Sequence, residues 1–208
     1  MIAFIVRGMN AVCEKIAYHL LILSDRIRGV DFHEMDESGT GDGYRYECTH
    51  PRILKQLDRI CHDVMPSDAL LDVGCGKGRM LAFFSRYPFR VVDGIEYNER
   101  LAEIGARNAN RLQLESKIFC ADVREFCFWD RYNYFYFYNP FPKRVMEICL
   151  QSILESVKRH PRKVTILYAN PTCHETLLEY GFKEEFFQQT AIEQIWQPYL
   201  SVLKKYTR

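Results

Sequence analysis

The chain has 208 residues, of which 48% are hydrophobic and 26% are charged. This composition predicts a folded globular protein with a substantial core, and it argues against extensive disorder. The formal net charge is only +1, so no overall field attracts nucleic acid or an anionic membrane surface. We therefore expect one domain with an N-terminal extension, and a small molecule or a protein is favoured over nucleic acid as its partner.

The eight cysteines form no CxxC pair and have no regular spacing, which excludes a disulfide framework or a structural zinc site as the simplest interpretation. The histidines also lack partners at ligand spacing, so we expect no metal. No segment approaches the roughly 20 apolar residues that span a bilayer, and the N-terminus shows no signal-peptide cleavage pattern. We therefore expect a cytoplasmic protein with reduced thiols and no membrane partner.

The N-terminal part of the chain contains two amphipathic segments. Apolar residues recur at helical spacing over residues 11–27, and this pattern predicts a helix. Residues 29–43 are rich in Gly, Asp, Glu and Ser, and they are typical of a flexible loop. Helical periodicity resumes over residues 49–64, where Thr49 is expected to cap the helix and Pro51 to lie in its first turn.

Short apolar segments then alternate with helical ones. We expect strands at 69–75, 89–97, 117–123, 133–138 and 163–170, and helices at 79–87, 98–113 and 142–160. This alternation predicts a parallel sheet with helices on both faces, because parallel neighbours need crossover connections. Residues 182–187 and 199–207 resemble strands joined by a short polar segment, and they predict a closing antiparallel hairpin.

A glycine-rich turn, "GCGKG", follows the first of these strands and precedes a helix. Glycines in such a turn allow a ligand to approach the main chain closely. The dinucleotide fingerprint would require Gly or Ala at Arg79, and a phosphate-binding P-loop would require Ser or Thr directly after Lys77. Neither requirement is met, so both of these nucleotide sites are excluded.

The remaining pattern, Asp72-x-Gly74-x-Gly76-x-Gly78, resembles the first motif of the class I, Rossmann-like, S-adenosylmethionine-dependent methyltransferases. The resemblance extends over residues 49–208, with residues 1–48 as an N-terminal helical extension and loop. It implies a three-layer αβα sandwich around a mostly parallel seven-stranded sheet whose last strand is antiparallel. It also implies that S-adenosyl-L-methionine is the cofactor and that Cys75 belongs to the loop that binds it.

Two further acids end the next two strands. Glu96 ends the second strand, and a carboxylate there can accept both hydroxyl protons of a ribose, which is the role that the resemblance implies. Asp122 ends the third strand, where the family's acid accepts the adenine amino proton and the neighbouring Val123 packs near the ring. The structural alternatives are a solvated Glu96 at a helix entry and an Asp122 that caps a short helix.

The fourth strand is strongly aromatic and stops at Asn139-Pro140-Phe141. This turn resembles the [Asp/Asn/Ser]-Pro-Pro-aromatic motif of amino-group methyltransferases. In that motif the Asn side chain and the next carbonyl accept hydrogens from a target nitrogen while the ring stacks on it. The resemblance therefore makes Asn139, Pro140 and Phe141 the candidate catalytic residues, with Asn139 also near the cofactor. The second proline of the motif is replaced by Phe141, which weakens any transfer of nucleobase or glutamine specificity.

The structural alternative is an Asn-Pro turn that closes a buried strand, and we expect the rings of residues 134–137 to fill the core. Asn170-Pro171, which ends the fifth strand, is interpreted as a structural turn. Upstream, Tyr44, Tyr46 and His50 lie where such proteins often contact substrate.

The sequence thus predicts an S-adenosylmethionine-dependent methyltransferase that acts on nitrogen, with a methyl acceptor that these residues do not identify. The alternatives are an O- or carboxylate methyltransferase of a small molecule and a non-catalytic module that binds the cofactor. No residue is an evident strong general base, so positioning is expected to supply most of the rate.

Overall fold

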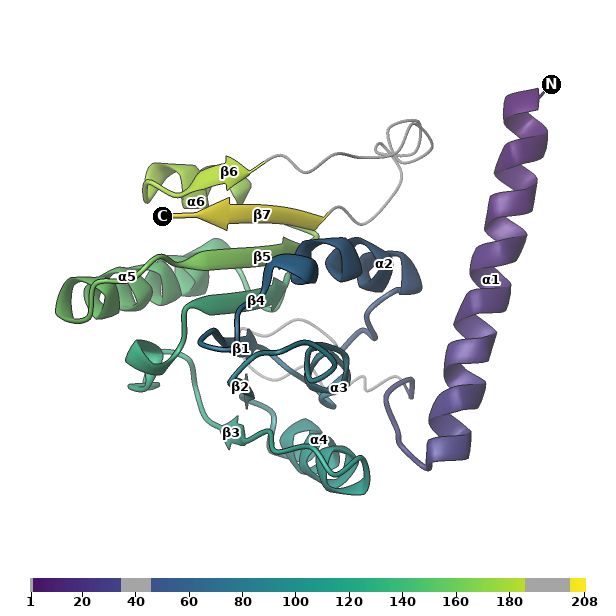
Figure 1. Cartoon of the computed structure of the whole chain (residues 1–208), viewed down its shortest axis with the longest axis horizontal. Coiled ribbons are helices and arrows are strands. Elements are labelled where there is room, and N and C mark those ends of the chain that lie inside the picture. The colour runs from purple at the N-terminus through teal and green to yellow at the C-terminus, as the bar shows by residue number, and fades with distance from the viewer. Residues whose placement is uncertain (1, 35–45, 186–202) are drawn as a thin grey trace.

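The structure is a computed structural model that describes residues 2–34, 46–185 and 203–208. Its strands form one seven-stranded sheet in the order β3-β2-β1-β4-β5-β7-β6 (Figure 1). The strands are β1 (Ala69–Val73), β2 (Val91–Glu96), β3 (Ile118–Cys120), β4 (Tyr134–Tyr138), β5 (Thr165–Ala169), β6 (Lys183–Glu185) and β7 (Leu203–Thr207). Neighbours among the first five are parallel, and β7 is antiparallel to both β5 and β6. The predicted fold class is therefore confirmed.

Helices cover both faces of this sheet. They are α1 (Ile2–Arg28), α2 (Pro51–Ile60), α3 (Arg79–Phe84), α4 (Glu99–Arg111), α5 (Lys143–Arg159) and α6 (His174–Glu179), with short 3-10 turns η1 (Cys61–Asp63) and η2 (Trp129–Arg131). In the described part of the chain, none of these helices is both long and apolar enough to cross a membrane.

The aromatic strand β4 separates two hydrophobic cores. Successive side chains of a strand point to opposite faces, so Phe135 and Phe137 join the core beneath α5 while Tyr136 joins the core beneath α2 and α3. All three side chains are buried, as the sequence predicted. Every residue of the flanking strands β1 and β5 is buried as well, which is typical of central parallel strands covered on both faces.

The N-terminal extension differs from its prediction. Helix α1 begins at Ile2 rather than near residue 11, and residues 29–34 are not a flexible linker, because Val30 and Phe32 are buried. Polar contacts tie this segment to the body: the Asn108 side chain accepts the Asp31 backbone N–H at 3.0 Å and donates to the Asp31 carbonyl at 2.8 Å. The rest of the predicted loop, residues 35–43, lies outside the described residues.

Two further expectations are corrected. Thr49 does not cap α2; His50 does, since its Nδ1 accepts the backbone N–H of Arg52 at 3.3 Å. Helix α6 was not predicted, because six residues provide too little periodicity to recognise. The closing antiparallel pair, β6 with β7, is confirmed, although residues 186–202 between them are outside the described chain.

Candidate functional site

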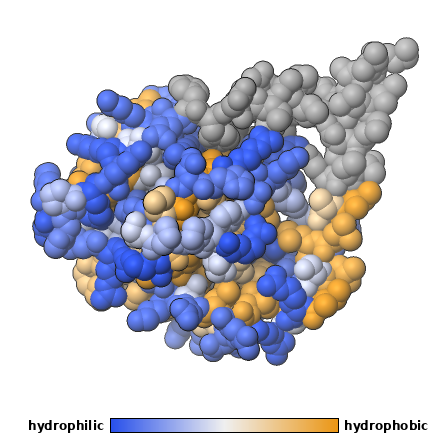
Figure 2. Space-filling view, in the orientation of Figure 1, coloured by the Kyte–Doolittle hydropathy of each residue, from blue (hydrophilic) through white to orange (hydrophobic). Residues whose placement is uncertain are grey.

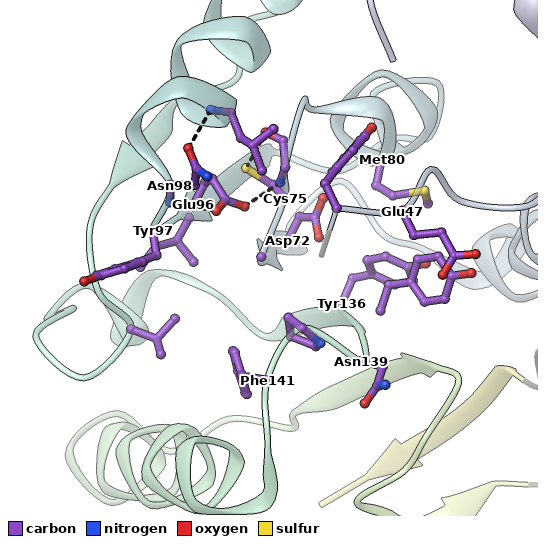
Figure 3. A pocket seen from close by; sticks show the side chains of 18 of the residues that line it. Glu47, Asp72, Cys75, Met80, Glu96, Tyr97, Asn98, Tyr136, Asn139 and Phe141 are labelled. Atoms are coloured by element: carbon purple, nitrogen blue, oxygen red, sulfur yellow. Dashed lines mark hydrogen bonds between the residues drawn. The ribbon is translucent and has the colours of Figure 1, made fainter. Parts of the chain in front are cut away.

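A cavity of about 280 Å³ opens at the carboxyl ends of β1, β2 and β4, where open α/β sheets bind their ligands. Figure 3 shows Asp72 and Glu96 on one side of it and Asn139 and Phe141 on the other. Its walls are formed by Tyr46, Glu47, Thr49, Asp72, Gly74, Cys75, Gly76, Arg79, Met80, Ile95, Glu96, Tyr97, Asn98, Leu101, Asp122, Val123, Arg124, Tyr136, Tyr138, Asn139, Pro140, Phe141, Val145 and Asn170.

The glycine loop requires glycine for two separate reasons. Gly74, Gly76 and Gly78 have φ values of +83°, +52° and +81°, a conformation that other residues rarely adopt. A Cβ atom at Gly74 would also lie 2.6 Å from the Cβ of Pro140, and one at Gly76 would collide with the Tyr46 ring. Gly78 is the N-cap residue of α3 and stands outside the cavity wall. The loop therefore packs directly against the Asn-Pro turn that ends β4.

Glu96 fixes the glycine loop to the end of β2. Its Oε2 accepts the backbone N–H of Gly76 and its Oε1 that of Asn98, each at 2.8 Å. Burial raises the pKa of Glu96, and the backbone hydrogen bonds oppose that shift. The alternative of a freely solvated Glu96 is therefore wrong, although each oxygen keeps a second lone pair for a ligand.

Asp72 is the most unusual acid of the site. Its side chain is buried, and its Oδ2 has no hydrogen-bond partner in the described part of the chain. Burial raises the pKa of Asp72 well above its ordinary value, and the neighbouring Glu96 raises it further. A buried carboxylate oxygen without a partner is costly, so this atom is suited to a ligand that brings a donor or a positive charge.

The Cys75 side chain packs between the glycine loop and β2. A Cβ atom at Gly94 would lie 2.6 Å from the Cys75 Sγ, so the thiol occupies the space that the glycine in β2 leaves. The thiol is buried, and burial raises its pKa well above the ordinary value. Its closeness to β2 makes it a packing residue that also contributes to the cavity wall.

Arg79 is a cavity residue that sequence reasoning missed. It follows the glycine loop, is buried, and forms an ion pair with the buried Asp25 of α1. Its Nε has no hydrogen-bond partner within residues 2–34, 46–185 and 203–208. The neighbouring Lys77 makes a similar contact, since its Nζ lies 2.7 Å from Oδ2 of Asp31. The N-terminal extension therefore forms ion pairs with Lys77 in the glycine loop and with Arg79 directly after it.

Asp122 and Val123 lie at the end of the cavity next to β3. The Asp122 carboxylate accepts the Arg124 backbone N–H at 2.9 Å and pairs with the Arg124 guanidinium at 2.5 Å. Hydrogen bonding from Arg124 lowers the pKa of Asp122. No helix follows directly, because the next helical turn, η2, begins at Trp129, so the helix-cap alternative is wrong.

The Asn-Pro turn forms the opposite wall. Asn139 has a left-handed backbone with φ of +41°, and its Oδ1 accepts a hydrogen bond from the Thr172 hydroxyl at 2.5 Å. Phe141 is buried and packs edge-on against Phe137, with ring centroids 6.1 Å apart. Asn170, interpreted as purely structural, also lines this wall. The strand ends of β4 and β5 therefore build one neutral surface.

The other residues that the sequence singled out have different positions in the structure. Tyr46 lines the cavity, and its hydroxyl donates to the Phe32 carbonyl at 2.7 Å. His50 serves as the cap of α2 and is not part of the wall, and Tyr44 lies outside the described residues. Tyr136, expected to be core, is both buried and part of the cavity wall.

Comparison with known proteins shows which family this chain resembles. A family described as a methyltransferase domain matches residues 70–161, the segment that contains the glycine loop, Glu96, Asp122 and Asn139. The chain contains a methyltransferase domain and has the fold of the class I methyltransferases. Such a domain implies S-adenosylmethionine as the cofactor. A search of curated protein sequences finds no match to this methyltransferase.

Several solved structures share the methyltransferase fold at low sequence identity. The PH0226 protein of Pyrococcus horikoshii is 15% identical, with a TM-score of 0.55 over 74% of this chain and 88% of that one. An rRNA methylase of Streptococcus thermophilus is 14% identical, with a TM-score of 0.53 over 78% and 97% of the two chains. The magnesium protoporphyrin IX methyltransferase of Synechocystis, solved with its cofactor, is 12% identical, with a TM-score of 0.54 over 76% and 78%.

The cavity fits this cofactor on the chemistry of its own atoms. S-adenosylmethionine carries a sulfonium, an ammonium and a carboxylate together with a ribose and an adenine. The methyltransferase domain offers a buried acidic oxygen on Asp72 and a buried guanidinium nitrogen on Arg79, neither of which has a hydrogen-bond partner among the residues that the structure describes. The acidic oxygen suits an ammonium group and the guanidinium suits a carboxylate, and the amino-acid part of the cofactor carries both.

Proposed function

We propose that this methyltransferase transfers its methyl group to a nitrogen atom. The observation that carries the proposal is the position of Asn139-Pro140-Phe141, which lines the same cavity as Asp72 and Glu96 but from the opposite wall. An amide oxygen beside an aromatic ring suits an amine acceptor, because the oxygen accepts the N–H group and the ring contacts the nitrogen as it becomes positively charged.

The cofactor residues follow from the charged half of the cavity. Glu96 would accept the ribose hydroxyls, Asp72 the ammonium group, and Arg79 would hold the carboxylate. Asp122 and Val123 would contact the adenine. The loop of Gly74, Cys75, Gly76 and Gly78 would provide the close backbone approach that the glycine geometry supports. When bound, the cofactor supplies a methyl group on a positively charged sulfur.

The acceptor residues have a positioning role. The Thr172 hydroxyl occupies one lone pair of the Asn139 Oδ1 and holds that side chain, which leaves the second lone pair for an acceptor N–H. Pro140 and the buried Phe141 form the adjacent wall and exclude water. An amide oxygen is too weak a base to keep the proton that the acceptor nitrogen loses, so the proton leaves to solvent. The rate therefore depends on alignment and desolvation.

The class of acceptor remains wider than the composition suggested. The rRNA methylase and the porphyrin methyltransferase share this fold, and one acts on nucleic acid while the other acts on a small molecule. The near-zero net charge alone therefore gives no reason to prefer a small molecule or protein over nucleic acid. An acceptor screen for this protein should include amines, peptides and RNA, with hydroxyl and carboxylate compounds as the competing class.

Substitution of Asn139 by Ala tests the proposal. We expect turnover to fall roughly 100- to 1,000-fold, the loss typical of removing one preorganised polar group at a reacting centre. Cofactor affinity measured by calorimetry should not change. Asn170→Ala is a matched control, because Asn170 ends the neighbouring strand in the same wall. Unchanged turnover in Asn139→Ala, or isotopic label found on oxygen in the product, would show the nitrogen assignment to be wrong.

A further inference from the structure

The N-terminal extension packs on the body through a short stretch, residues 25–34, which we call the docking segment. Helix α1 stands at the margin of the molecule, and the chain after it turns back toward the body (Figure 1). Apolar residues gather along the lower part of α1, and several of them are exposed (Figure 2). Asp25, Val30 and Phe32 are buried instead. Burial of the described part of the extension is therefore concentrated in the docking segment.

The docking segment holds the side chain of Lys77, which lies between the last two glycines of the glycine loop. This side chain is only 3% exposed, and Lys77 is not among the residues that line the cavity. Its Nζ lies 2.7 Å from Oδ2 of Asp31 and donates to the Glu34 carbonyl at 2.8 Å. A buried ammonium group needs such partners, because its desolvation is otherwise costly. Lys77 is therefore turned away from the cavity and toward the extension.

Asn108 of α4 joins the same two residues through their backbones. Its buried side-chain amide donates to the Lys77 carbonyl at 3.0 Å and to the Asp31 carbonyl at 2.8 Å. Its Oδ1 accepts the Asp31 backbone N–H at 3.0 Å. The glycine loop and the docking segment are thus connected by an ion pair and by backbone hydrogen bonds at the same point.

Two residues of the cavity wall also contact the docking segment. Arg79 pairs with Asp25, and its guanidinium carbon lies 4.8 Å from the centre of the Phe32 ring. Tyr46 donates its hydroxyl to the Phe32 carbonyl at 2.7 Å, and its ring occupies the space that a Cβ atom at Gly76 would need. Both residues line the cavity. A displacement of the docking segment would therefore move the cavity wall together with the glycine loop.

We propose that the docking segment positions the glycine loop for the cofactor, with Asp31 and Lys77 as the positioning residues, and that the bound cofactor in turn holds the segment in place. The loop contains three glycines with positive φ, and glycine loses more conformational freedom than any other residue when it is fixed. Contacts that order the loop before binding remove part of this cost from the binding step. The coupling is reciprocal, because it is a free energy shared by the two events.

This role rests on the cofactor assigned to the cavity, and it does not depend on which atom is methylated. Calorimetric titration of the full chain with S-adenosylhomocysteine tests it. We expect Asp31→Asn and Lys77→Met each to weaken binding about 10-fold. The double variant should be weakened no further, because the two residues act as one pair. Lys15→Gln is the matched control, since it removes one charge from an exposed side chain of the same extension outside the docking segment. It should bind as the wild type does.

Hydrogen exchange followed by mass spectrometry tests the reverse coupling in the wild-type protein. S-adenosylhomocysteine should slow the exchange of the backbone amides of residues 29–34, although none of these residues lines the cavity. The protection should be smaller in Lys77→Met at the same ligand saturation. Helix α6 is the internal reference, because its residues do not line the cavity either, and its exchange should not change. A contact that only supports packing would not give this local protection.

Unchanged affinity in Asp31→Asn, or additive losses in the double variant, would overturn the positioning role and leave the cofactor site intact. A lower stability in urea with unchanged affinity would likewise assign these contacts to packing alone. If the wild-type protein does not bind S-adenosylhomocysteine, the cofactor assignment fails and the positioning role fails with it. Binding with methyl label found on oxygen would contradict only the choice of nitrogen as the acceptor.

Discussion

The two halves of the cavity are built from opposite kinds of residue. The half at the ends of β1, β2 and β3 carries the acids Asp72, Glu96 and Asp122, whereas the half at the ends of β4 and β5 carries Asn139 and Asn170 with aromatic rings. Both halves lie at the same edge of one sheet. The difference matches the two ligands: acids suit a cationic cofactor, whereas a wall without acids does not stabilise the protonated, unreactive form of an amine acceptor.

Substitutions in the two halves of the cavity should also change different measured properties. Charged groups that are buried and paired affect both stability and cofactor binding, whereas neutral groups that position an acceptor affect turnover alone. The halves meet where β1 pairs with β4 and where Gly74 lies against Pro140. Variants that separate these readouts therefore test the comparison directly.

The largest effect is expected for Asp25→Ala, which leaves the buried Arg79 of the charged half without its carboxylate. Removing one partner of a buried ion pair typically costs about 3–5 kcal/mol, and we expect a loss near 3 kcal/mol in urea unfolding. Glu103→Gln is the matched control, because it breaks the exposed pair with Arg107, and exposed pairs contribute less than about 1 kcal/mol. Equal losses in the two variants would show that the Asp25 pair is no more important than a surface pair.

Glu96→Gln should weaken cofactor binding by about 100-fold, since hydrogen bonds to a charged group contribute roughly 1.5–3 kcal/mol and one acceptor oxygen is lost. Calorimetry measures the affinity, and turnover at saturating cofactor should fall much less. Glu99→Gln, in the first turn of α4, removes a nearby exposed acid and should bind the cofactor as the wild type does. If Glu96→Gln keeps full affinity, the acid at the end of β2 has no role in binding.

Asp72→Asn should change stability and binding in opposite directions. Because burial raises the pKa of Asp72, the stability that this group contributes is present below its unfolded pKa and is lost as pH rises through the folded pKa. At pH 7 the ligand-free variant should therefore be more stable, by about 1 kcal/mol, while cofactor affinity falls about 10-fold. Thermal unfolding and calorimetry measure the two effects.

The pH dependence of cofactor binding by the wild-type protein tests the same role of Asp72. Cofactor affinity should begin to fall, as pH is lowered, at a higher pH than an ordinary aspartate would give, because Asp72 becomes protonated there. The Asp72→Asn variant should lack this part of the profile. An unchanged profile in that variant would assign the titration to another group.

The smallest effect is expected for Thr172→Val in the neutral half. Thr172→Val removes the hydroxyl that holds Asn139 and should lower turnover about 3- to 10-fold, as one neutral hydrogen bond is worth roughly 1 kcal/mol. Cofactor affinity should stay the same, and Thr172→Ser should restore turnover because it keeps the donor. A fall in affinity equal to the fall in turnover would mean that the two halves do not act separately.

Both halves were partly predictable from sequence. The acids and glycines of the charged half and Asn139-Pro140-Phe141 of the neutral half were expected at strand ends, whereas Arg79 and Asn170 were not expected in the cavity wall. The glycine loop, Glu96 and Asp122 each follow an apolar strand, and the ends of parallel strands meet at one edge of the sheet. Asn170 belongs to a strand end as well, but an Asn-Pro pair is a common turn. Its place in the wall depends on β5 lying beside β4, which a local pattern does not reveal.

By itself the sequence determined the alternation of strands and helices, and hence the parallel sheet, because hydrophobic period and turn chemistry are local properties. It also placed the acids and glycines at strand ends. Only the tertiary structure decided that Arg79 pairs with Asp25, 54 residues away, that residues 29–34 pack on the glycine loop, and that Thr172 holds Asn139. Such contacts join distant segments whose proximity is set by the packing of the whole chain rather than by any short stretch of it.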